Sequence, residues 1–136
     1  MYYSKIHNLE TGDKIVEPLF STGLTKHYAI YLGIDRNGIE WIAENHKFKN
    51  VQIIRADQYF SSAKIERIDK FVGSVSDRKK VISRAVALTG KHYDLITYNC
   101  EHFASEITTG YVQSFQIKNA FAFLIGVIFL NLLIQE

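Results

Sequence analysis

The chain has 136 residues, of which 47% are hydrophobic, and its 16 Lys and Arg residues nearly balance its 14 Asp and Glu residues. This length suits one domain with one core, and the hydrophobic content with a single proline excludes an extensively disordered chain. The formal charge of +2 produces no large electrostatic field, so we expect no nucleic acid among the partners.

The beginning of the chain carries charged residues within its first ten positions and has no apolar run, so we expect no signal peptide. Cys100 is the only cysteine, which excludes an internal disulfide and is compatible with a reducing compartment. We therefore expect a cytoplasmic protein.

The N-terminal half predicts an antiparallel sheet. A short extended segment follows Gly12, and Pro18 either ends it or places it at a sheet edge. Asn37-Gly38 is a strong hairpin signal between two segments rich in β-branched and aromatic residues. A third strand continues the meander, and residues 57–71 are expected to form a loop with a short helix. The expected strands are His27–Ile34, Ile39–His46 and Val51–Ala56.

The C-terminal half predicts two helices. The first shows apolar residues at helical spacing, with Ser76 or Asp77 as its cap and Gly90 at its end. The second begins after Asn99, a good N-cap, and ends at Gly110. Because the strands come first and the helices follow, the fold class is α+β.

The last segment, Ala120 to Ile134, is apolar on every side and is interrupted only by Asn131. Its fifteen residues would form a helix about 22 Å long, whereas a bilayer core requires roughly 20 residues, so the segment is short for a membrane span. It is therefore either a C-terminal helix or strand buried against the domain, or a membrane-associated segment. We divide the chain into a domain of residues 1–113 and a hydrophobic tail of residues 114–136.

The lone cysteine stands in a polar setting at the expected start of the second helix. With Asn99 as N-cap, Cys100 occupies the first helical position, where the dipole and the unpaired amides favour a thiolate. The same amides can bind the oxyanion of an acyl intermediate. Glu101 suits the first turn electrostatically, so we regard Asn99 and Glu101 as support for the cap and the oxyanion.

A thiolate requires a base, and the nearest histidine in sequence is the wrong one. His102 lies about 200° around the helix from Cys100, so it points away from the thiol. His27 and His46 lie on adjacent strands of one hairpin. A four-residue loop would place them face to face, whereas a two-residue loop would bring His46 diagonal to His27, and either register keeps them near each other. Glu44 shares the face of His46. Two histidines and a glutamate could also bind a metal, or could simply be polar residues on a solvated sheet face.

Four motifs together resemble the lecithin:retinol acyltransferase (LRAT) family. They are "TGDKI", "KHYAIYLG", "EWIAENH" and "YDLITYNCEHFASEITTG", and the last contains the family's Asn-Cys-Glu-His-Phe unchanged. The resemblance covers roughly Leu9 to Gly110. It implies a circularly permuted papain-like α+β domain, in which an antiparallel meander packs against helices and the catalytic cysteine begins a helix.

The resemblance also implies roles for individual residues. Cys100 would be the nucleophile that forms an acyl-thioester, and His27 the general base. The third catalytic residue departs from the family pattern: alignment of the strand favours Glu44, whereas residue type favours His46. The resemblance implies no cofactor and no bound metal.

Three functions are compatible with these residues. The first is a thiol-dependent acyltransferase or phospholipase that acts on lipid acyl groups. The second is a cysteine peptidase or amidase of the same fold, and the third is a non-catalytic interaction domain. Vertebrate members of the family carry a C-terminal membrane anchor, so the resemblance favours membrane association of the tail over burial, with lipid as the substrate class.

Overall fold

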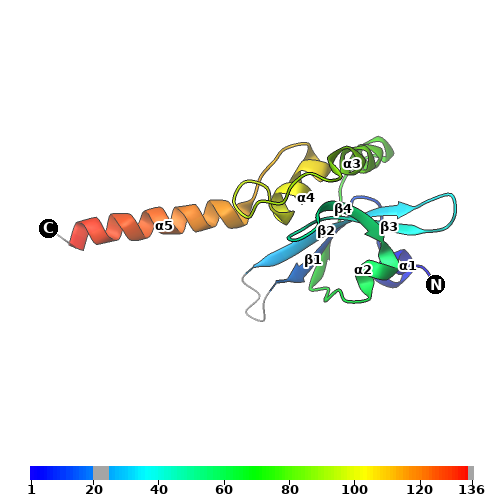
Figure 1. Ribbon diagram of the computed structural model, residues 1–136, viewed down its shortest axis with the longest axis horizontal. Coiled ribbons are helices and arrows are strands. Elements are labelled where there is room, and N and C mark those ends of the chain that lie inside the picture. Colours follow the sequence, from blue (N-terminus) through cyan, green and yellow to red (C-terminus); the bar gives the residue numbers. More distant parts are fainter. Residues whose placement is uncertain (20–24, 135–136) are drawn as a thin grey trace.

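The computed structural model describes residues 1–19 and 25–134. Within these residues the chain forms a five-stranded antiparallel sheet with the strand order β4-β3-β2-β1-β5. Helices lie against both faces of the sheet, and one long helix projects from the domain (Figure 1). The strands are β1 Lys14–Pro18, β2 Lys26–Ile34, β3 Glu40–His46, β4 Asn50–Arg55 and β5 Arg67–Asp69. The helices are α1 Tyr3–His7, α2 Ala56–Phe60, α3 Val75–Leu88, α4 Cys100–Thr109 and α5 Phe115–Ile134.

The sheet separates two hydrophobic clusters. Because successive side chains of a strand point to opposite faces, Tyr28 and Ile30 of β2 face α3 and α4, whereas Ala29 and Tyr31 face α2. Both faces of the central strand are thus buried, which explains why it is an almost continuous apolar run rather than an alternating one. The predicted α+β class, with an antiparallel sheet and packed helices, is confirmed at this level.

The register of the β2–β3 hairpin differs from the prediction next to the turn and agrees with it further from the turn. Ile34 pairs with Glu40, not with Ile39, so the loop is one residue longer than expected. An irregularity between Tyr31 and Gly33 takes up the extra residue, and Gly33 adopts a φ of 111° there. Beyond this bulge, where Tyr31 pairs with Ile42 and Ala29 with Glu44, the register is the one that a four-residue loop predicts.

The edges of the sheet were only partly predicted. Pro18 does end β1, but β1 is not an edge strand, since β5 pairs with its other side. The segment 57–71 contains the expected short helix as the continuation of α2, but also β5, which was not predicted. α1 was not predicted either. Both missed elements are short, so their local sequence signal is weak.

The helix caps show how local polar residues set helix ends. α3 is capped by Ser74, not by Ser76 or Asp77 as predicted, and Asp77 is its partner in a capping box. The Ser74 hydroxyl accepts from the Asp77 amide at 3.1 Å, while the Asp77 carboxylate accepts from the Ser74 amide at 2.9 Å. For α4 the predicted caps are confirmed: Asn99 begins it, and Gly110 ends it with a φ of 85°.

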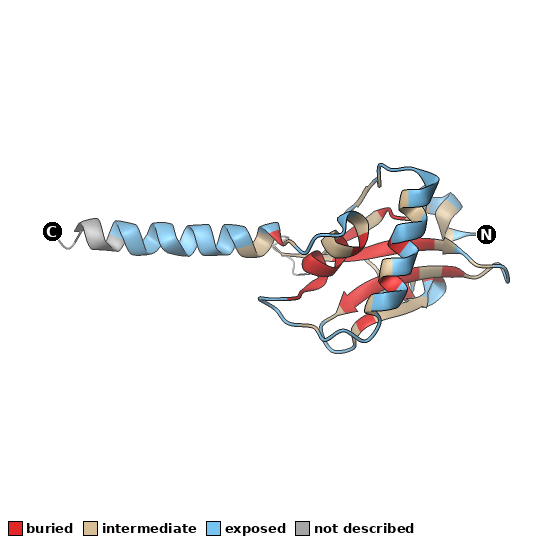
Figure 2. Ribbon diagram, turned by 90° about the horizontal axis from the view of Figure 1, so that it is seen from above, coloured by how far each residue is buried: buried red, intermediate tan, exposed pale blue. Residues whose placement is uncertain are grey.

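The C-terminal tail forms α5, which extends away from the domain (Figures 1 and 2). The side chains of residues 118–130 are exposed, so the alternative of a segment buried against the domain is wrong. Among residues 1–19 and 25–134, none of the helices combines the length and the hydropathy that crossing a membrane would take.

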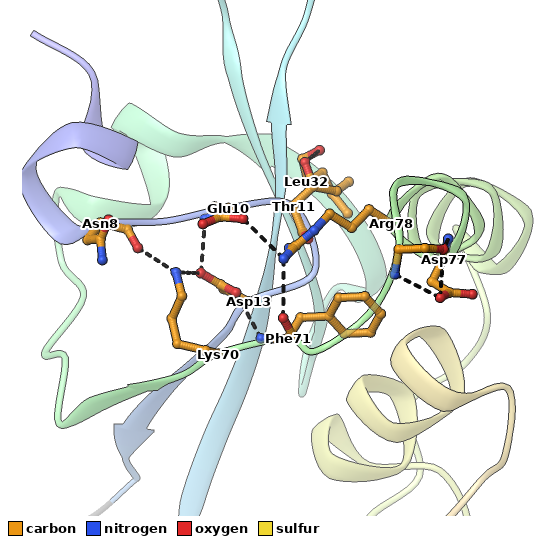
Figure 3. A network of polar contacts seen from close by, with 10 residues as sticks. Asn8, Glu10, Thr11, Asp13, Leu32, Lys70, Phe71, Asp77 and Arg78 are labelled. Carbon is orange, nitrogen blue, oxygen red and sulfur yellow. Dashed lines mark hydrogen bonds and ion pairs between the residues drawn. The ribbon is translucent and has the colours of Figure 1, made fainter.

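A buried carboxylate joins the N-terminal loop to the segment before α3 (Figure 3). Asp13 is fully buried and accepts hydrogen bonds from the amides of Glu10 and Phe71, both at 2.9 Å. It also pairs with the ammonium group of Lys70. Arg78 of α3 adds an ion pair with Glu10 at 3.0 Å. These contacts hold the loop before β1 against α3 and so fix one side of the sheet.

Candidate active site

Cys100 is the first residue of α4 and is only 4% exposed. Its Sγ lies 3.6 Å from the carbonyl oxygen of Lys26, to which the thiol donates. The expected set of free amides is smaller than predicted, because the Asn99 side chain accepts from the amides of Glu101 at 2.9 Å and His102 at 3.1 Å. The amide of Cys100 itself has no hydrogen-bond partner among the described residues.

His102 completes the cap of α4. Its Nδ1 accepts from the Asn99 amide at 3.1 Å, in a reciprocal capping box. Burial lowers the pKa of His102 below its ordinary value, so the neutral imidazole that accepts this hydrogen bond is favoured. The side chain thus points away from the thiol, as its helical position predicted.

His27, the second residue of β2, lies between a thiol and a carboxylate. Its Nε2 is 2.7 Å from Oε2 of Glu44. Burial alone would lower the pKa of His27, but hydrogen bonds with Cys100 and Glu44, together with their negative charges, raise it to about 10. The imidazole is therefore held in its protonated form at neutral pH, in contact with both partners.

Glu44 is buried in β3, with 5% exposure, and both of its carboxylate oxygens are bonded. One accepts from His27 and the other from Nε2 of Gln52 at 2.7 Å. Burial would raise the pKa of Glu44, but the hydrogen bond and the charge of His27 outweigh this and hold the pKa below its ordinary value. A charged carboxylate is thus maintained against the imidazolium.

His46 is the alternative partner for His27, and it makes a different contact. Its Nδ1 accepts from the backbone amide of Phe48 at 3.1 Å, within the turn that follows β3. Glu44 reaches His27 diagonally across the ladder, because Glu44 pairs directly with Ala29. Of the two candidates for the third position, Glu44 is therefore the one that contacts His27.

Two cavities meet at His27. One, of about 390 Å³, is bounded mainly by polar groups, among them Lys49, Gln52 and Gln58. The other, of about 290 Å³, is bounded by Pro18, Leu19, Lys47 and Phe48 and is the more apolar of the two. Both cavities share the side chains of Glu17, His27 and His46 as a common wall.

Glu101 has a role that its position in the first turn did not predict. Its Oε2 accepts from the Ser114 hydroxyl at 2.6 Å and from the Gln116 amide at 3.0 Å. The carboxylate thus joins the start of α4 to the start of α5. The residues that sequence reasoning missed are Gln52, Ser114 and Gln116. Only Gln52 had a usable signal, since the turn after β3 places it opposite Glu44.

The chemistry of the site is that of a thiol, an imidazole and a carboxylate. Within the described part of the chain, no cluster of three His, Cys, Asp or Glu residues is arranged to hold a metal ion. The alternative of a metal site on the His27–Glu44–His46 face therefore has no support in this geometry.

Comparison with known proteins gave one match. The family model described as lecithin retinol acyltransferase matches residues 7–113, which is most of the chain. Comparison with curated proteins found no match, and comparison with solved structures found none either. The matched range includes every residue of the thiol, imidazole and carboxylate cluster, and it ends just before Ser114 and Gln116.

Proposed function

The chain belongs to the lecithin retinol acyltransferase family, and from this premise we propose that it is a thiol-dependent acyltransferase or lipid hydrolase. The observation that carries the proposal is the contact of His27 with both Cys100 and Glu44. A nucleophile, a base and a group that orients the base are the elements of covalent acyl transfer.

The Cys100 sulfur donates to the Lys26 carbonyl only while it carries its proton. The proposed reaction starts once that proton has left, from a thiolate on Cys100 and an imidazolium on His27. The Sγ attacks the carbonyl carbon of an acyl ester, and the carbonyl electron pair moves to the oxygen, where the Cys100 amide is positioned to donate to the oxyanion. As the carbon–oxygen bond to the leaving alcohol breaks, His27 transfers its proton to that oxygen. An acyl-thioester on Cys100 remains.

The second half of the reaction releases the acyl group. An acceptor, either water or another alcohol or amine, gives its proton to His27 as it attacks the thioester carbonyl. The carbon–sulfur bond breaks, and the thiolate and imidazolium are restored. In this scheme Glu44 orients His27 through Nε2 and stabilises its positive charge, while Nδ1 remains for the exchange of protons with sulfur and oxygen.

The two cavities support a lipid as the acyl donor. A lipid ester combines a hydrocarbon chain with a polar group, and His27 lies where an apolar and a polar cavity meet. We assign the acyl chain to the side of Leu19 and Phe48, and the polar part to the side of Gln52 and Gln58. The acyl chain favours the side of Leu19 and Phe48, because burial of a hydrocarbon chain gains about 0.8 kcal/mol per methylene.

The exposed surface of α5 supports association with a membrane. Phe123, Leu124, Ile125 and Phe129 are each more than half exposed, and apolar residues surround the helix. An exposed apolar surface of this kind is typical of a region that contacts lipid or another protein. We propose that α5 binds at or within a lipid surface and brings the domain to its substrate.

Flotation of the full-length protein with phospholipid vesicles tests this part of the proposal. The double variant Phe123→Asp, Phe129→Asp should lose most vesicle binding, whereas Val72→Asp, at a position 94% exposed on the domain, should bind as the wild type does. Equal flotation of all three proteins would mean that α5 does not carry the interaction.

Turnover of a phospholipid tests the activity itself. The wild type should release or transfer an acyl chain, and Cys100→Ala should not, while both proteins keep the same circular dichroism spectrum. Cleavage of peptide or amide substrates by the wild type, without any lipid turnover, would instead favour the cysteine peptidase or amidase alternative.

A further inference from the structure

The start of α5 is bound to the residue next to Cys100. Glu101 accepts from the Ser114 hydroxyl at 2.6 Å and from the Gln116 amide at 3.0 Å. Ser114 is 2% exposed, and its hydroxyl also accepts from the Ile117 amide at 3.2 Å. A buried carboxylate with two donors is a well-determined contact, so the first turn of α5 has a fixed position relative to α4.

The side chain of Gln116 continues this contact to the beginning of β2. Its Oε1 accepts from the backbone amide of Lys26 at 3.0 Å, across 90 positions of the sequence. Lys26 immediately precedes His27, and its carbonyl oxygen accepts from the Cys100 thiol. The backbone of Lys26 thus contacts Gln116 through its N–H and Cys100 through its carbonyl oxygen, and it continues directly into His27.

The sheet leaves both backbone polar groups of Lys26 available. Lys26 and Pro18 are a non-hydrogen-bonded pair of the β1–β2 ladder, since Leu19 donates to Thr25 in the neighbouring pair, so the N–H and the carbonyl of Lys26 point away from β1. The ladder with β3 ends at Ala29 and Glu44, so on that side the carbonyl is open to the thiol and the N–H to Gln116. Hydrogen bonds and one peptide bond form a closed circuit through Cys100, Glu101, Gln116 and Lys26.

We infer that Gln116 is a positioning residue of the active site, whose side-chain oxygen fixes the Lys26 peptide and thereby the separation between the Cys100 thiol and the His27 imidazole. The inference rests on the proposed thiol chemistry, which needs those two groups within hydrogen-bond reach. It makes the first turn of α5 part of the active site and separates that turn from the exposed apolar remainder of the helix.

Loss of this contact should slow the chemical step. When the start of β2 can move, the Cys100 thiol loses its fixed acceptor, and His27, the next residue of β2, is no longer held within hydrogen-bond reach of the sulfur. Turnover should fall in kcat with little change in KM, because Gln116 acts on the geometry of the reacting groups and not on substrate binding.

The test compares Gln116→Met with Gln113→Met in the full-length protein. Both changes replace an amide by a thioether of similar length, and Gln113 accepts only from the exposed ammonium group of Lys118, at 3.5 Å. The measurement is the rate of Cys100 alkylation by iodoacetamide at neutral pH, followed by intact mass. Gln116→Met should slow alkylation about 10-fold. Gln113→Met should coincide with the wild type.

Two results would overturn the inference. One is an alkylation rate of Gln116→Met equal to that of the wild type at an unchanged melting temperature. The other is an equal alkylation rate together with a lower melting temperature, because Gln116 would then only stabilise the fold. Alkylation needs no acyl substrate, so the comparison decides on Gln116 even if the protein turns over no lipid; in that case the proposed function fails and the positioning role does not.

Discussion

Two buried carboxylates, Asp13 and Glu44, make a useful comparison within one small domain. Both are almost inaccessible to solvent, at 0% and 5% exposure, and both accept hydrogen bonds at both oxygens. Asp13 is held by two backbone amides and Lys70, and it connects a loop to the segment before α3 (Figure 3). Glu44 is held by His27 and Gln52 beside a cavity.

The difference lies in the donors. Two of the donors to Asp13 are backbone amides, which do not titrate. The donor to Glu44 is the imidazole of His27, which also interacts with the Cys100 thiol. This imidazole can therefore give up or take a proton during a reaction. Burial of a carboxylate alone therefore does not mark an active site, whereas a titratable donor beside a cavity does.

The largest loss of activity is expected from substitution of His27, the residue that contacts Glu44. His27→Ala should lower kcat/KM for acyl transfer by about 10³- to 10⁴-fold, because it removes the base that exchanges the proton with sulfur and oxygen. The free energy of unfolding should change by much less than the activation free energy of acyl transfer does. His92→Ala, at an exposed position, serves as the control and should keep full turnover.

Substitution of Asp13 should instead lower the stability of the fold and leave turnover by the folded protein intact. Asp13→Ala leaves the amides of Glu10 and Phe71 without their acceptor and removes the ion-pair partner of Lys70, so we expect the free energy of unfolding to fall by about 3 kcal/mol. Chemical denaturation measures this change. Asp57→Ala, which removes an exposed partner of Arg55, should leave the unfolding midpoint nearly unchanged. A loss of turnover in folded Asp13→Ala protein would contradict the structural role.

Glu44→Gln should give an intermediate effect that depends on pH. Its carboxylate helps to raise the pKa of His27 to about 10, so the variant should lose activity at a lower alkaline pH and lower kcat about 10- to 100-fold. A pH–rate profile of wild type and variant measures the shift of the alkaline limb. Coincident alkaline limbs would show that Glu44 does not set the protonation of His27.

The same pair makes a prediction for folding stability. Glu44 has a lowered pKa and His27 a raised one, so their mutual stabilisation is complete above the ordinary pKa of 4.5 and below 6.5. It declines as the pH rises from 6.5 through about 10. The stability advantage of wild type over Glu44→Gln should therefore be largest near pH 5.5 and should shrink at alkaline pH.

The smallest effect is expected at His46. His46→Ala removes a turn contact with Phe48 but leaves the His27–Glu44 contact in place, so kcat should change less than about 2-fold. A side-by-side assay with Glu44→Gln decides which of the two residues orients His27. A larger loss for His46→Ala than for Glu44→Gln would reverse the assignment.

Local patterns were enough to predict part of this molecule. The β2–β3 hairpin, the start of α4 at Asn99 and its end at Gly110 follow from turn and cap residues that act within a few positions. The exclusion of His102 as a base also follows from helix geometry alone. The cap of α3 was misplaced by two or three residues, because Ser74, Ser76 and Asp77 are all good capping residues. The Ser-x-x-Asp spacing of Ser74 and Asp77, which is the local signal of a capping box, was not used.

The remaining features depend on contacts between distant segments. β5 has only three residues, and its pairing with β1 is not visible in its own sequence. The contact between Gln116 and Lys26 spans 90 positions, and no periodicity or turn signal relates them. The choice of Glu44 over His46 likewise needed the side-chain positions, since the two residues share one face of β3 and it is Glu44 that contacts His27, at 2.7 Å.

The account depends most on Cys100 as the residue that receives the acyl group. The direct measurement is the intact mass of the full-length protein after brief incubation with a phospholipid, followed by peptide mapping. The account predicts a gain of one acyl chain in a thioester at Cys100, with no gain in Cys100→Ala. Acyl release from the lipid without any adduct at Cys100, or with equal turnover by Cys100→Ala, would contradict it.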